Sequence, residues 1–400
     1  AVAGGLLTRA LLPSFTPTRG VSLAVVAVMM TVPHMLARPH MLALAPMMVW
    51  AVGLVRAADA GRAPSLWLLP VMTLWANLHG GFTLGLGLAC AFALEAVLEG
   101  HKRGLLRPAL THWGLFVALS VGASLITPNG VSGLAMTWQL MVQDQYALSR
   151  IGEWASPNFH QFQPLAFWLL GGMAVALTLG LRLPPVRLAL LLGLVYLSLK
   201  HMRNVELLGL LAPLIVARAV RLQWGRKDAA ARPDAVQGWL ARSARAASGR
   251  ALALCLALCV AVTVLLAQLR PVELPETAAP IRALEAARRA GLTGPVLNEY
   301  SWGGYLIYQG VPVFIDGRAD IYRDAFMRSY TQALELHTPG ELEALLARHH
   351  IGWTLLAAQT PAIAVLDRLP GWRRVYADAL SVVHERTGLA ETVKDPDRKE

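Results

Sequence analysis

Ionisable side chains stand at the ends of apolar segments between residues 37 and 204. The stretches that carry them read ARPHML (37–42), WANLHGGF (75–82) and KHMRN (200–204). A charge at the centre of a bilayer costs about 2.5–3.5 kcal/mol and less at its surface, so such residues are rare unless they have a role. Cations that meet at one place can bind a phosphate or pyrophosphate group. The candidate anion-binding residues are Arg38, His40, His79, Lys200, His201 and Arg203.

The same residues also have a structural interpretation. Long cationic side chains at helix ends extend towards the membrane surface, which is the better explanation for any one of them. The set as a whole, with two histidines and an arginine in ARPH and NLHGG, favours a binding site. Asn77 belongs to the same candidate site, because Gly80 and Gly81 after it allow a ligand to approach the backbone closely.

A carboxylate and an aromatic ring occur together in IGEWASPNFH (151–160). Glu153 is one of only eight acidic residues in the first 270 and is our candidate for a general base or a metal ligand. The alternative is an ion pair with Arg150. Trp154 is either an ordinary aromatic residue of the membrane interface or a platform for a sugar ring.

A second group of polar residues lies in LNEYSWGGYLIYQGVPVFIDGRADIYR (297–323). Asp316, Arg318 and Asp320 follow the predicted strand VPVFI, and α/β domains place binding sites at the carboxyl ends of strands. An equally good interpretation is a turn in which Arg318 pairs with Asp320 or Asp324. Two glycines after a predicted strand can bind an anion, but the stretch is neither G-x-G-x-x-G nor a P-loop.

The chain that carries these residues has the composition of a membrane protein. Of its 400 residues 55% are hydrophobic and 15% are charged, against about 25% charged in soluble domains. The net charge is +11, and the basic excess lies in the short loops of residues 1–270, which argues against a nucleic-acid partner. Apolar segments predict helices near 1–12, 21–36, 38–55, 64–78, 80–99, 109–126, 164–181, 186–199, 203–220 and 250–268.

The loops predict the orientation of these helices. If each segment spans once, most of the Arg and Lys residues fall on one side, which the positive-inside rule makes cytoplasmic. Arg182 and Arg187 flank one of these turns. The other side receives all of the candidate residues, so we expect Asn77 and His79 at the outer mouth of two helices. Because the first residues resemble the end of a helix, we expect the chain to lack its natural N-terminus.

The predicted fold class is mostly α: a polytopic transmembrane bundle of about ten helices, followed by a small extracytoplasmic α/β domain. Strands are expected in GPVLNE, VPVFID and IGWTLLAA, with one or two more in WRRVYADALSVVHE, and helices between them. The predicted organisation is a transmembrane domain (1–220), a basic cytoplasmic linker (221–249), a last transmembrane helix (250–270), a periplasmic α/β domain (271–392) and a disordered tail (393–400).

Several stretches together resemble a known group of proteins. They are ARPHML, WANLHGGF, TPNG, EWASPNF, RNVELLGLLAPL and GGYLIYQGVPVFIDGRADIY. The chain resembles a group of bacterial polytopic membrane proteins that are similar to the GT-C superfamily of glycosyltransferases. The resemblance implies a location in the bacterial cytoplasmic membrane, a polyprenyl-phosphate-linked sugar as lipid donor, and transfer on the outer face.

The resemblance also implies roles for residues. Phosphate binding would fall on the six cationic residues named above. The main catalytic acid of GT-C enzymes lies in the first external loop, which we expect to precede Ala1, and Glu153 would be a second acid. GT-C enzymes differ in their need for a divalent cation, so the cofactor stays open. Two alternatives also stay open: a non-catalytic transporter or lipid-binding or assembly protein, and a GT-C fold without activity.

Overall fold

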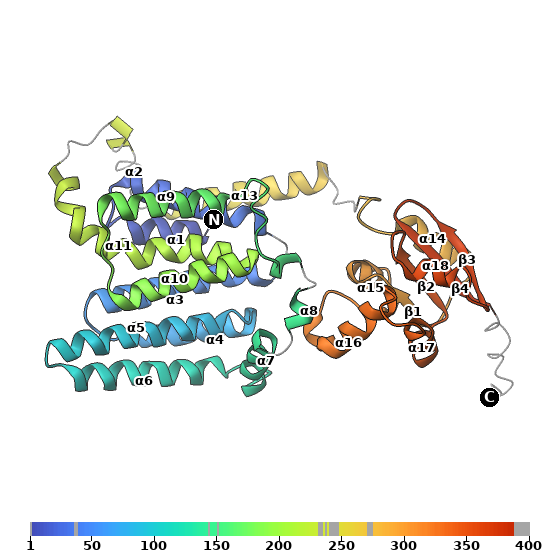
Figure 1. Cartoon of the computed structure of the whole chain (residues 1–400). Coiled ribbons are helices and arrows are strands. Elements are labelled where there is room, and N and C mark those ends of the chain that lie inside the picture. Colours follow the sequence, from blue (N-terminus) through green and yellow to red (C-terminus); the bar gives the residue numbers. More distant parts are fainter. Residues whose placement is uncertain are drawn as a thin grey trace, which may run out of the picture. The chain divides into compact units, whose positions relative to one another are not determined.

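The computed structural model describes residues 2–35, 39–142, 145–149, 152–230, 235–236, 238–239, 248–269 and 275–387 (Figure 1). The chain divides into two compact units. The helical unit comprises residues 1–143 and 149–246, and the C-terminal unit comprises residues 144–148 and 247–400. The predicted tail at 393–400 lies outside the described residues.

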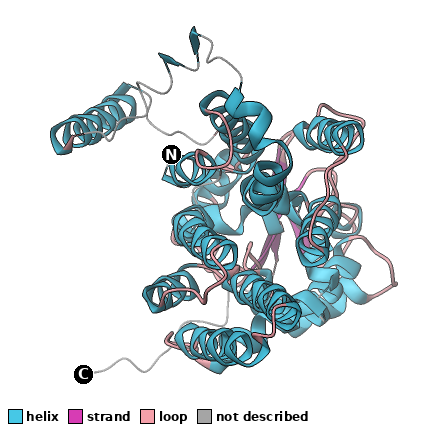
Figure 2. Cartoon of the chain, turned by 90° about the vertical axis from the view of Figure 1, so that its left-hand side faces the viewer, coloured by secondary structure: helices cyan, strands magenta, loops and turns pink. Residues whose placement is uncertain are grey.

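Each of the ten predicted apolar segments coincides with a helix. These helices are α1 (Val2–Leu11), α2 (Pro17–Thr31), α3 (Pro39–Asp59), α4 (Leu69–Leu78), α5 (Phe82–Lys102), α6 (Leu106–Ser124), α9 (Pro164–Leu179), α10 (Pro185–Lys200), α11 (Val205–Ala230) and α13 (Gly249–Leu269). Among the described residues, three helices are long and apolar enough to cross a membrane: His40–Asp59, Phe82–Lys102 and Gly249–Leu269. Figure 2 views the helical unit from one end, so that many helices are seen along their axes.

Proline and glycine set several of the helix ends. Proline is the first residue of α2, α9 and α10, where its fixed φ suits a helix and its missing N–H costs nothing. Gly180 ends α9 in the left-handed conformation, with φ of 62°. Two short helices that the sequence did not predict, α7 (Val131–Val142) and α8 (Gln145–Ser149), follow α6.

The core of the helical unit joins α3, α4 and α5 through two tryptophans and a glycine. The Trp50 indole N–H donates a hydrogen bond of 2.9 Å to the Gly85 carbonyl. A Cβ atom on Gly85 would lie 2.4 Å from the Trp75 ring, so only glycine lets α4 approach α5 this closely. Both tryptophans are buried. This packing fixes the start of α3 and the end of α4, which carry His40 and His79.

The C-terminal unit contains a four-stranded sheet with helices around it (Figure 1). Its strands are β1 (Val296–Asn298), β2 (Trp353–Ala357), β3 (Trp372–Ala377) and β4 (Ser381–Arg386), in the order β1-β2-β4-β3. Strands β1 and β2 are parallel, and the other two pairs are antiparallel. Its helices after α13 are α14 (Ile281–Arg289), α15 (Gly303–Tyr308), α16 (Ala319–Leu334), α17 (Glu341–Arg348) and α18 (Ala362–Leu366).

The strand predicted in VPVFID is wrong. Asn298 Oδ1 accepts hydrogen bonds from the amides of Phe314 and Ile315, and its Nδ2 donates to the Ile315 carbonyl. Pro312 has no N–H to offer to a ladder. A single side-chain amide therefore replaces the main-chain pairing that a strand would need, and the segment has no assigned secondary structure. The other predicted strands are confirmed, and WRRVYADALSVVHE forms the β3–β4 hairpin.

Candidate functional site

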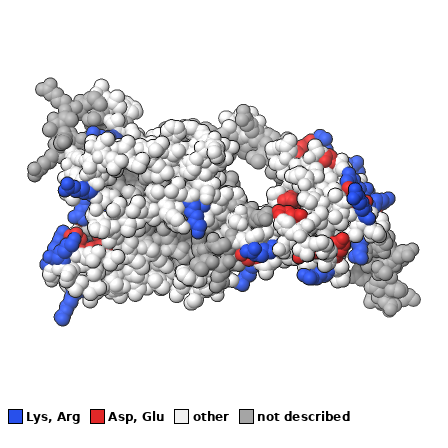
Figure 3. All heavy atoms as spheres, in the orientation of Figure 1, with Lys and Arg blue, Asp and Glu red and all other residues white. Residues whose placement is uncertain are grey.

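Several candidate residues converge at one end of the helical unit. This end carries the start of α3, the end of α4, two 3₁₀ turns (Gly152–Trp154 and Met202–Asn204) and the start of α11. The two turns contact each other although they are about fifty residues apart in the chain. The face seen in Figure 3 is mostly uncharged between the ends of the unit, so charged groups concentrate at its ends.

Arg203 and His79 form the centre of this cluster. The distance from Arg203 Nη2 to His79 Nε2 is 3.2 Å. On the other side of the imidazole ring, the Gly81 amide donates a hydrogen bond of 3.0 Å to His79 Nδ1. Gly81 precedes the first residue of α5, so its N–H is one of the free amides that begin a helix.

These two contacts cannot both be hydrogen bonds to a neutral or a protonated imidazole. If Nδ1 accepts from Gly81, the proton of a neutral ring is on Nε2, and Nε2–H then faces the guanidinium, which only donates. Burial, with the positive charges of Arg203 and His40, lowers the pKa of His79 to about 4, so the ring is neutral at pH 7. With the proton on Nε2, two donors lie 3.2 Å apart, and an acceptor oxygen placed between them can accept a hydrogen bond from each.

Trp154 and His201 complete one side of the cluster. The Arg203 guanidinium lies over the Trp154 ring, 4.5 Å from its centroid, which is a cation–π contact. His201 meets the same ring edge-on at 5.1 Å, and its Nδ1 is 2.6 Å from the Trp154 carbonyl oxygen. These contacts hold Arg203 in one orientation.

His40, His34 and Glu153 lie on the other side. The rings of His40 and His79 are 6.2 Å apart, and His40 Nε2 is 3.3 Å from the His34 carbonyl oxygen. The negative charge of Glu153 acts on the His34 ring. Glu153 is therefore close to His34.

Glu206 is a site residue that the sequence interpretation missed. It lies in the first turn of α11, is 7% exposed, and its Oε2 has no hydrogen-bond partner among the described residues. Arg203 and Glu153 are close enough to act on it electrostatically. A buried carboxylate oxygen without a partner is costly, so it marks a place where a proton or ligand is expected. The sequence feature that could have identified Glu206 is its position as a single acid at the start of an apolar helix, three residues after Arg203.

Other predicted site residues lie apart from this cluster or serve the fold. The Asn77 amide donates to the carbonyls of Thr73 and Ile126, at 2.8 Å each, and ties α4 to the end of α6. Lys200 is exposed, and its main-chain carbonyl accepts a hydrogen bond from the Ser156 hydroxyl. Arg38 lies outside the described residues, which leaves its assignment untested.

The acidic group of the C-terminal unit forms a turn. Asp316 is 2% exposed and accepts hydrogen bonds from the amide and guanidinium of Arg318 and from the Tyr322 hydroxyl. The hydrogen bond from Arg318 lowers the pKa of Asp316. Among the described residues the ion pair of Arg318 is thus with Asp316 and not with Asp324, whereas the predicted pairing with Asp320 stays untested. The side chain of Asp320 is outside the described residues.

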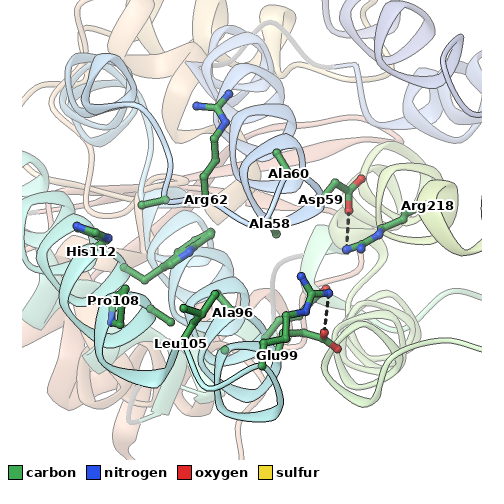
Figure 4. Close-up of a pocket in the computed structure, with 17 residues that line it drawn as sticks. Ala58, Asp59, Ala60, Arg62, Ala96, Glu99, Leu105, Pro108, His112 and Arg218 are labelled. Atoms are coloured by element: carbon green, nitrogen blue, oxygen red, sulfur yellow. Dashed lines mark hydrogen bonds and ion pairs between the residues drawn. The ribbon is translucent and has the colours of Figure 1, made fainter.

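A cavity of about 220 Å³ lies at the opposite end of the same helices, between the ends of α3 and α5, the start of α6, and α11 (Figure 4). Asp59 pairs there with Arg218 at 3.8 Å and, at 2.5 Å, with Arg187, whose Nε donates to Glu95 at 2.9 Å. Arg187 is 1% exposed. It lies in the first turn of α10, and its guanidinium joins three other helices.

The described histidines and acids of the helical unit do not form a metal site. Among the described residues, no group of three or more His, Cys, Asp and Glu side chains could hold a metal ion. In comparisons with known proteins, no family model matches the chain, and no match is found among the curated proteins. The function is therefore argued from the site itself.

Proposed function

We propose that this chain is a membrane glycosyltransferase that uses a polyprenyl-phosphate-linked sugar. In this proposal the helical unit crosses the bacterial cytoplasmic membrane several times, and the cluster around Arg203 and His79 faces outward. The three helices long enough to cross a membrane and the uncharged middle of the helical unit support a membrane location. The C-terminal unit follows α13 and would lie on the outer side.

The observation that carries the proposal is the distance of 3.2 Å between Arg203 Nη2 and His79 Nε2, which are both donors when His79 Nδ1 accepts from the Gly81 amide. A phosphate oxygen accepts from Arg203 and from His79 Nε2 at once, which removes the conflict between two donors. His40, one ring away, extends the set of donors. The Trp154 ring is a candidate platform for the sugar, although Arg203 already covers part of it.

The reaction follows from these groups. A hydroxyl oxygen of the acceptor attacks the anomeric carbon of the sugar, and the bond from that carbon to the phosphate oxygen breaks. The leaving polyprenyl phosphate keeps the electron pair, and Arg203 and His79 stabilise the negative charge that develops on it. The proton of the acceptor hydroxyl goes to a carboxylate. We assign that role to Glu206, whose Oε2 has no partner among the described residues, with Glu153 as the second acid.

One observation favours a second function. Arg187, Glu95 and Asp59 form an ion network inside the helical unit, and buried charges between membrane helices are typical of transporters. A non-catalytic lipid transporter would bind the same phosphate at the outer cluster and transfer no sugar. Sugar transfer therefore separates the two functions, whereas lipid binding is common to both.

The first experiment measures undecaprenyl-phosphate binding to the full-length protein in nanodiscs by native mass spectrometry. The variants are Arg203→Met and His79→Ala, and Lys200→Met is the matched control, because Lys200 is an exposed cation at the same end. Each charged hydrogen bond lost should weaken binding about tenfold or more. Saturable binding that only the first two variants weaken supports the lipid-phosphate site. Equal binding by all variants, or binding no tighter than that of a bulk anionic lipid, refutes it.

The second experiment tests transfer with a radiolabelled polyprenyl-phosphate sugar and a membrane extract as acceptor. Glu206→Gln should abolish transfer and leave lipid binding intact, since the amide keeps the shape of the carboxyl group. Lipid binding by the wild type without any transfer would support the transporter instead.

A further inference from the structure

A hollow in the C-terminal unit lies where two parallel strands end. It has a volume of about 340 Å³. Glu299 and Ser301 follow β1, and Gln359 and Thr360 follow β2. The carboxyl ends of adjacent parallel strands are where open α/β sheets bind ligands. From the sequence we expected a binding site at the carboxyl end of a strand before Asp316. In the structure the strand that ends beside a hollow is β1.

The side chains around the hollow can donate and accept hydrogen bonds that the protein leaves unused. Within the described residues, the hydroxyls of Ser301, Thr360 and Thr277 and the amide of Gln359 have no hydrogen-bond partner. Glu299 is half-buried and accepts hydrogen bonds from the amides of the next two residues, and burial raises its pKa. Hydroxyl and amide groups both donate and accept, whereas a carboxylate only accepts.

The charges around the hollow select the ligand. Among the described residues that line it, none is Lys, Arg or His, and Glu299 is the only acid. A phosphate or carboxylate ligand would therefore meet a negative charge without a compensating cation. A wholly apolar ligand would leave the three hydroxyls and the amide without a partner. A neutral, polyhydroxylated ligand can donate to Glu299 and exchange hydrogen bonds with the hydroxyls and the amide.

We propose that this hollow binds one or two sugar residues of a neutral glycan. Its volume is at the small end of ligand pockets, which hold about 300–1,000 Å³. Hydrogen bonds from sugar hydroxyls to the Glu299 carboxylate are the strong contacts, because one partner is ionised. The inference stands independently of the lipid-phosphate site, since it uses only residues of the C-terminal unit.

The test uses the full-length protein in nanodiscs, with maltotriose, cellotriose and chitotriose as probes in saturation-transfer-difference NMR titrations. Saturable binding of at least one trisaccharide is expected. Glu299→Gln should weaken it about tenfold, which is the difference between a charged and a neutral hydrogen bond. Glu343→Gln is the matched control, because Glu343 is an exposed acid of the same unit that does not line the hollow, and its affinity should equal that of the wild type.

Three results would overturn the proposal. The first is the lack of saturable binding of all three trisaccharides. The second is an equal effect of the two substitutions. The third is saturation of the site by putrescine but by no sugar, which would make the hollow a cation site. Unchanged thermal unfolding of Glu299→Gln shows that the variant is folded. Undecaprenyl-phosphate binding to the same samples reports on the helical unit separately, so failure of one proposal is distinguishable from failure of the other.

Discussion

Replacing Arg187 by methionine should destabilise the helical unit strongly. In the wild type Arg187 donates to both oxygens of Glu95 at 2.9 and 3.0 Å, to Asp59, and to the Ile215 carbonyl at 3.3 Å. Glu95 is 6% exposed and would be left as a buried charge without its partner. Breaking a buried pair in this way costs about 3–5 kcal/mol. Asp59 keeps Arg218 at 3.8 Å, so most of the loss arises at Glu95.

The assay is unfolding of the detergent-solubilised protein by added SDS, followed by circular dichroism. The double variant Arg187→Met, Glu95→Gln removes both charges and should recover a large part of the loss, because no uncompensated charge is then buried. Arg182→Met is the control, since Arg182 is an exposed arginine just before α10 and, among the described residues, only its main chain makes hydrogen bonds. The reasoning is refuted if Arg187→Met costs no more than the control, or if the two substitutions in the double variant are simply additive.

Three further predictions concern packing, titration and a loop. Gly85→Ala places a Cβ 2.4 Å from the Trp75 ring and should cost about 1–3 kcal/mol in the same assay, whereas Gly87→Ala meets nothing within 4 Å and should be neutral or stabilising. Burial lowers the pKa of the folded-state His384, so the unfolded chain binds a proton at higher pH than the folded chain does. Stability should therefore fall as pH drops below about 6.5. In thermal unfolding scans at several pH values, His384→Gln should reduce this dependence of stability on pH. Asn298→Ala leaves two amide N–H groups without their acceptor and should lower the unfolding free energy of the C-terminal unit by about 1–3 kcal/mol in urea titrations, and no loss would contradict the assigned contacts.

The apolar segments and the sheet were largely predictable, because they depend on local patterns. Runs of apolar residues indicate helices regardless of what the helices pack against. Strands β2, β3 and β4 lie in stretches rich in residues of high strand propensity, bounded by turn residues. The prediction of a strand around Pro312 was wrong because the segment's hydrogen-bond partner is distant in the sequence. Its main-chain groups are satisfied by the side chain of Asn298, sixteen residues earlier, and no pattern in VPVFID encodes that partner.

The sequence predicted several residues of the candidate site, but it did not predict the contacts between their side chains. His40, His79 and Arg203 were expected at one end, and the structure brings them together. The opposed donors depend on the Gly81 amide fixing the imidazole, which only the fold reveals. Glu206 was missed because a single acid in an apolar helix is more often paired than free, and its missing partner is visible only in three dimensions.

The two edges of the small sheet have a consequence for self-association. An open edge strand is a template on which another chain can pair and aggregate. Strand β1 is three residues long, and the Tyr330 hydroxyl donates to its last carbonyl, that of Asn298. Strand β3, at the other edge, exposes Arg373 and Arg374, and charged side chains on an edge strand disfavour pairing with a second chain. Loss of these edge features should therefore appear first as β-rich aggregates of intact chains and only later as loss of the fold.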